Sequence, residues 1–149
     1  MTMKQFGRLV GSWKTEATHP AMPGVVVHGT AVIEWLEGEQ FLITRSRTDH
    51  PDFPDAMTIT GNIERDRTNG DAKVEAKTSM HYYDSRGVFR DFDVSIDDVA
   101  WRWERIAPGF SQRFTGTFTD GGNTIVGVTQ LCQDDVTWTD DLAITFRRA

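Results

Sequence analysis

Hydrophobic and polar residues alternate along most of the chain, in short stretches separated by turn-forming residues. A period of two is typical of β-strands that bury one face. Residues 3–9 are instead predicted to form a short helical turn that plugs one end of a sheet. The pattern predicts about ten strands, at residues 11–18, 25–37, 40–49, 57–63, 78–83, 88–96, 101–107, 110–118, 124–131 and 136–146.

The stretch 101–118 predicts a hairpin folded about Pro108-Gly109. One face of this hairpin is largely aromatic, and the other carries charges of opposite sign, such as Glu104 facing Arg113. Pro-Gly favours a type II turn, whereas two-residue hairpins prefer the primed types, so a longer loop and a shifted register are open alternatives. The pairs expected on the aromatic face are Arg105 with Gln112, Trp103 with Phe114, and Trp101 with Gly116.

Two further registers stay open at this point. A two-residue loop within the turn at 84–87 would set His81 opposite Arg90, whereas a three-residue loop would set Tyr82 there instead. In the strand at 40–49, either face could point inward.

Short turns connect nearly all of the predicted strands, which favours an all-β, up-and-down antiparallel meander. Closing the first strand on the last hides both edges, so we expect a single β-barrel domain over residues 1–149. A barrel of about ten strands is wide enough to enclose a ligand. The polar stretch 65–76 is predicted to be a mobile loop.

Composition and charge limit the kinds of partner that the protein is expected to bind. The net charge of −6 disfavours nucleic acid and anionic membranes, and no apolar run is long enough to span a bilayer. The N-terminus lacks the apolar region of a secretion signal, and a lone Cys132 cannot form an internal disulfide, so we expect a cytoplasmic protein, monomeric or homodimeric. The histidines lack metal-ligand spacing, so no metal site is predicted.

The motif Gly11-x-Trp13 after the helical turn resembles the start of lipocalin-like (calycin-type) barrels. The stretches 15–20, 45–51, 81–87 and 108–114 resemble an uncharacterised bacterial family of lipocalin-like domains. The resemblance implies a barrel and carries no established activity.

A more distant resemblance is to nitrobindin-like haem barrels and fatty-acid-binding-protein-like barrels. The nitrobindin-like start is Gly-x-Trp-x-Gly-x-Gly, but Thr15 and Ala17 replace its later glycines here. Those proteins hold iron through a late histidine, and this chain has no histidine after His81. No cofactor is therefore predicted, and haem is a disfavoured alternative.

Alternation puts Arg90 and Gln112 among apolar residues, where a polar group needs a partner. That partner could be a ligand anion or an internal acid. The aromatic residues on the same faces either line a cavity or pack as core. The candidate ligand-binding residues are Trp35, His81, Tyr83, Arg90, Trp101, Trp103, Gln112, Phe114 and Trp138.

The favoured hypothesis is a protein that binds a small hydrophobic or amphipathic molecule, with an anionic group on the ligand as one option. A first alternative is an isomerase or cyclase that uses His81, Tyr83 and Arg90 as polar groups in a shaped pocket, with no catalytic residue assigned. It requires those three side chains to converge on one cavity. A second alternative is haem binding.

Overall fold

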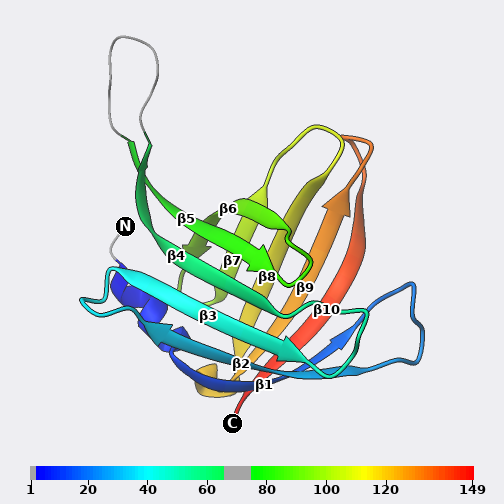
Figure 1. Ribbon diagram of the computed structural model, residues 1–149, viewed down its shortest axis with the longest axis horizontal. Helices are drawn as coiled ribbons and strands as arrows, with labels where there is room; N and C mark the ends of the chain where they lie inside the picture. The colour runs from blue at the N-terminus through cyan, green and yellow to red at the C-terminus, as the bar shows by residue number, and fades with distance from the viewer. Residues whose placement is uncertain (1–2, 66–74) are drawn as a thin grey trace.

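The computed structural model describes residues 3–65 and 75–149, and it forms a closed barrel of ten antiparallel strands (Figure 1). Consecutive strands pair with each other, and β1 pairs with β10. The predicted fold class is therefore confirmed, although most of the predicted loop at 65–76 lies outside the described residues. The elements are η1 (Met3–Leu9), β1 (Gly11–Thr18), β2 (Val27–Trp35), β3 (Phe41–Thr48), β4 (Ala56–Arg65), β5 (Glu75–Asp84), β6 (Phe89–Ile96), β7 (Ala100–Arg105), β8 (Ser111–Thr119), η2 (Asp120–Gly122), β9 (Thr124–Cys132) and β10 (Trp138–Arg148).

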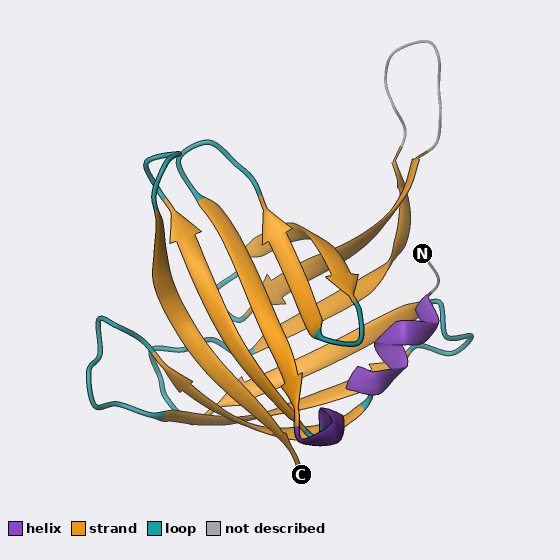
Figure 2. Cartoon of the chain, turned by 180° about the vertical axis from the view of Figure 1, so that it is seen from behind, coloured by secondary structure: helices purple, strands orange, loops and turns teal. Residues whose placement is uncertain are grey.

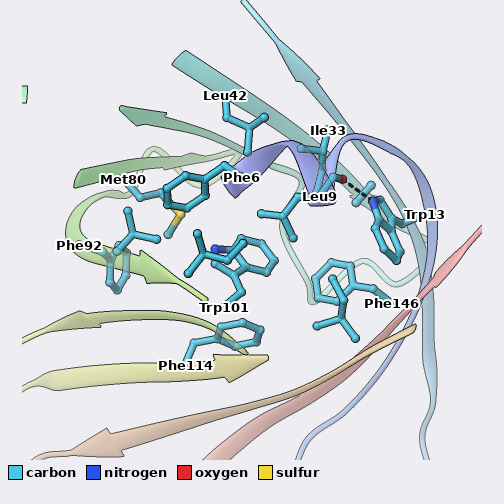
Figure 3. Packing of buried hydrophobic residues seen from close by; sticks show 14 of the residues in the cluster. Phe6, Leu9, Trp13, Ile33, Leu42, Met80, Phe92, Trp101, Phe114 and Phe146 are labelled. Atoms are coloured by element: carbon cyan, nitrogen blue, oxygen red, sulfur yellow. Dashed lines mark hydrogen bonds between the residues drawn. The ribbon is translucent and has the colours of Figure 1, made fainter. Parts of the chain in front are cut away.

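The short 3₁₀ helix η1 lies against one end of the barrel, which we call the closed end (Figure 2). Phe6 and Leu9 are fully buried and point into the core (Figure 3). The Trp13 indole Nε1 donates a hydrogen bond to the Leu9 carbonyl, at 2.8 Å. This bond satisfies a buried carbonyl at the end of η1 and ties the plug to β1, which gives Trp13 a structural role.

Most of the core gathers at this closed end. Its members come from every part of the chain and enclose Trp101, which is 4% exposed. Burial of this apolar surface is the main term that stabilises the barrel. The buried cluster consists of Met3, Phe6, Leu9, Trp13, Ala31, Ile33, Leu42, Met80, Phe92, Val94, Ile96, Trp101, Phe114, Ile125 and Phe146.

Two facing glycines form the seat of an aromatic stack. Gly116 of β8 pairs with Gly127 of β9. A Cβ at Gly127 would lie 2.5 Å from Phe114 Cε2, and one at Gly116 would lie 2.9 Å from Phe114 Cε1. Because both positions lack a side chain, the Phe114 ring can lie against the wall and stack on Trp103, with centroids 3.8 Å apart.

The predicted register of the 101–118 hairpin is confirmed. Arg105 pairs with Gln112, and the ladder continues through Trp103 with Phe114. The loop is longer than two residues, because the strands end at Arg105 and begin again at Ser111. Its tip is the expected type II turn, with Gly109 at φ 78° and a bond from the Phe110 amide to the Ala107 carbonyl.

The β5–β6 turn takes the three-residue alternative. The Asp84 amide bonds to the Val88 carbonyl around a loop that ends in Gly87, at φ 83°. Tyr82 therefore pairs with Arg90. Since side chains alternate faces, this register turns Tyr82 inward and the residues on either side of it outward.

A β-bulge interrupts β10 between Asp140 and Ala143. The extra residue reverses the alternation, so Trp138 pairs with Cys132 on the face opposite to that of Ile144. The same pairing logic settles the ambiguous strand β3, because Thr44 is the partner of the core residue Ile33.

Candidate ligand-binding site

Not every inward-facing side chain of the barrel is fully buried. Four residues, from β3, β4, β7 and β9, share a face with core side chains and yet stay partly exposed. We call the part of the interior that they line the open half, and the barrel end opposite η1 the mouth. The four residues are Thr44, Thr58, Trp103 and Thr129.

An aromatic shelf forms the floor of this open half, and we define it as Phe92, Trp103 and Phe114. Phe114 is 1% exposed and lies flat on Trp103, with an interplanar angle of 16°. Phe92 meets Trp103 edge-on, with centroids 6.4 Å apart. Because Trp103 is only half-buried, the shelf can offer apolar surface to a guest molecule.

Two arginines line the mouth above the shelf, and we call them the arginine pair, Arg90 and Arg105. Arg90 Nη1 donates to the Phe89 carbonyl at 3.1 Å, and Arg105 Nη1 donates to the Phe110 carbonyl at 2.9 Å. Arg90 Cζ lies 5.8 Å from the centroid of the Phe110 ring, so both guanidinium groups flank this one residue. Beside Arg105, the Gln112 Oε1 atom is buried without a hydrogen-bond partner in the structure.

Asp84 is an inward-facing acid at the mouth, and donors of its own turn already bind its carboxylate. Arg86 Nη2 lies 2.7 Å from Asp84 Oδ2, and this contact with Arg86 is the main reason that the pKa of the carboxyl lies below its usual value. The Tyr82 hydroxyl donates to the same oxygen at 2.8 Å. Burial, together with Asp84, raises the pKa of Tyr82 to about 12, so the phenol is neutral at physiological pH.

The pair of His19 and Asp141 at the rim has no free nitrogen for acid–base work. His19 Nε2 lies 2.5 Å from Asp141 Oδ1, and His19 Nδ1 accepts a hydrogen bond from the Ala21 amide at 3.1 Å. Since the amide can only donate, Nε2 carries the hydrogen. The pair anchors the loop after β1 to the β10 bulge.

The structure gathers four of the candidate residues in the open half, namely Arg90, Trp103, Gln112 and Phe114. Trp35 and Trp101 also face inward, but both belong to the closed end. Trp35 packs on the core within contact distance of Gly7 in η1. Trp101 is 4% exposed, and its Nε1 atom has no hydrogen-bond partner in the structure.

Three candidates lie on the outer face and must be corrected. His81 lies edge-on to Phe89 with centroids 5.6 Å apart, and Tyr83 contacts the same ring at 5.3 Å. Trp138 lies beneath Arg113, whose Cζ is 4.0 Å from the indole centroid. The three-residue β5–β6 loop moves the first two outward, and the β10 bulge moves the third. His81 and Tyr83 thus do not converge with Arg90, which removes the arrangement that the isomerase or cyclase alternative required.

Tyr82 and Arg105 complete the wall, although neither was among the candidates. Arg105 could have been found, because alternation in the hairpin already put it on the aromatic face. Tyr82 could have been found from Gly87, whose freedom to adopt positive φ favours the three-residue loop.

Two surface grooves lie away from the interior. One, of about 430 Å³, runs along η1 and Asp97-Asp98, where Arg8 already donates to both carbonyls. The other, of about 350 Å³, includes Arg45, Met57 and Tyr83 on the outer face. Within residues 3–65 and 75–149, no cluster of three histidine, cysteine or acidic residues could hold a metal ion, and no helix could span a membrane.

Comparison with known proteins shows the fold alone. No protein-family model and no curated protein matches the chain. Rv2717c from M. tuberculosis superposes with a TM-score of 0.57 at 14% identity, over 99% of this chain and 96% of its own. The S-type phycobiliprotein lyase CPES from Guillardia theta gives 0.55 at 10% identity, over 100% and 93%. Both likenesses agree with the closed antiparallel barrel described above.

Proposed function

We propose that this protein binds a small hydrophobic or amphipathic molecule in the open half of the barrel, on the aromatic shelf. The observation that carries the proposal is Trp103, which faces the interior and is not fully buried, whereas its neighbours Trp101 and Phe114 are. An exposed aromatic surface gains free energy when an apolar guest displaces the water from it.

The polarity of the wall supports an amphipathic guest. Thr44 and Thr58 face the interior from β3 and β4, opposite each other in the ladder. Threonine hydroxyls both donate and accept hydrogen bonds, so they suit a ligand that carries polar groups along an apolar body. The likeness to a phycobiliprotein lyase agrees with small-molecule binding in a barrel of this shape and does not name the ligand.

Titration with Nile red, an uncharged fluorescent dye, tests the proposal. We expect saturable binding to the wild type, and we expect Trp103→Leu to weaken it about fivefold, since aromatic contacts contribute about 1 kcal/mol beyond their buried area. Trp138→Leu is the matched control, because it removes the same side chain from the outer face. Non-saturable binding, or equal losses in the two folded variants, would contradict the proposal.

A further inference from the structure

The arginine pair puts two positive charges on the inner wall of a protein whose net charge is −6. Each guanidinium carries five N–H donors. Among the residues that the structure describes, each of them makes one hydrogen bond, to the carbonyl of Phe89 or of Phe110. Most of the donors in both groups are therefore available to another partner.

No carboxylate among the described residues takes that role. In the part of the chain that the structure describes, neither arginine forms an ion pair. Asp84 faces inward but is bound by Arg86, Tyr82 and two amides of its own turn. Glu104 lies next to Arg105 in sequence, and alternation turns it to the outer face.

The two arginines occupy neighbouring positions on the inner wall. Continuing the β6–β7 register by one pair sets Arg105 beside Phe92, which is two residues from Arg90 on the same face. Both guanidinium groups also lie beside Phe110, one at its carbonyl and one near its ring. Neighbouring like charges on a half-buried wall repel each other, and a bound anion would offset that repulsion.

We propose that the ligand carries a carboxylate and that Arg90 and Arg105 bind it at the mouth. This inference rests on the proposed function and names the chemical class of its ligand, an amphipathic carboxylic acid. The planar guanidinium fork matches the two oxygens of a carboxylate.

The spacing along β7 sets the orientation of that ligand. Trp103 lies two residues below Arg105, or about 7 Å along the strand. The carboxylate would therefore remain at the mouth while the apolar body lies on the aromatic shelf. Gln112 Oε1, at the level of Arg105, is a further polar atom on the wall, and it has no hydrogen-bond partner among the described residues.

A pair of fluorescent probes tests the inference, namely dansylaminoundecanoic acid and its uncharged methyl ester. We expect the wild type to bind the acid about tenfold more tightly than the ester, with a preference that declines at high salt. Arg90→Met and Arg105→Met should each lose most of that preference, because the affinity for the acid falls more than the affinity for the ester.

Arg47→Met is the matched control. Arg47 lies on the exposed outer face of β3, so its loss changes the net charge equally without touching the interior. Equal affinity of the wild type for acid and ester would overturn the carboxylate site and leave the proposed function standing. Failure of both probes to bind would count against the proposed function itself. An equal loss of preference in Arg47→Met would show that overall charge, rather than the arginine pair, selects the acid.

Discussion

Replacing Gly127 with alanine tests how closely Phe114, part of the aromatic shelf, packs against β9. The new Cβ would lie 2.5 Å from Phe114 Cε2 and 3.0 Å from the Ile144 carbonyl oxygen. The backbone cannot withdraw without breaking the β9–β10 ladder, and Phe114 is held from the other side by Trp103. The substitution therefore overpacks a closed region of the wall.

Overpacking of this kind costs about 1–3 kcal/mol, whereas alanine is better than glycine in a strand by roughly 0.5–1 kcal/mol. We expect a net loss of about 1–2 kcal/mol in the free energy of unfolding. Urea unfolding, followed by circular dichroism and tryptophan fluorescence, measures it as a lower midpoint with an unchanged slope.

Gly7→Ala is the control, since its Cβ would meet Trp35 Cζ2 at an ordinary 3.8 Å and should leave stability unchanged or slightly raised. Phe114→Leu should relieve the clash, so the double variant should be more stable than the sum of the single effects predicts. If Gly127→Ala is as stable as the wild type, Phe114 does not pack as closely against Gly127 as the structure shows.

The remaining predictions concern the plug and the mouth. Trp13→Phe removes the hydrogen bond to the buried Leu9 carbonyl, so urea unfolding should show a loss of about 1–3 kcal/mol in the free energy of unfolding. An unchanged midpoint would show that this hydrogen bond does not stabilise the plug. The pKa of Asp84 is lower in the folded protein than its unfolded value of 3.8. The ionised carboxyl therefore adds to the free energy of unfolding above pH 3.8, and this contribution is lost as the pH falls below that value. Asp84→Asn should therefore be less stable than the wild type at pH 7. The loss should be only about 1 kcal/mol, because Arg86 is largely exposed to solvent. Between pH 5 and pH 2, the stability of Asp84→Asn should fall less than that of the wild type. Ultraviolet titration should find Tyr82 still protonated at pH 11, since its pKa is about 12, and Tyr82→Phe identifies the signal.

The sequence predicts the barrel well because the strands bury one face. In β2, alternation correctly assigns every second residue from Val27 to Trp35 to the interior. In β6, it does the same for every second residue from Arg90 to Ile96. Pairing in the 101–118 hairpin is also correct, since its aromatic and charged faces differ sharply. These local patterns are enough to identify four side chains of the open half.

Prediction fails where one extra residue changes the register. The loop at 85–87 and the bulge at 140–143 each shift the alternation by one position, which reverses the faces of the residues before them relative to those after them. Alternation without these shifts predicts His81 and Trp138 inside the barrel, whereas both lie outside. Hydropathy could not correct the error, because the outer face also carries large apolar side chains, such as Phe89, which is 51% exposed.

The most direct test of ligand binding in the open half follows the indole N–H resonances of the five tryptophans by NMR during titration with dansylaminoundecanoic acid. We expect saturable shifts for Trp103, on the shelf, and for Trp101 beside it, with ring centroids 4.8 Å apart. The resonance of Trp138, on the outer face, should not move. Shifts confined to Trp138, or no saturable shift at Trp103, would rule out binding on the aromatic shelf.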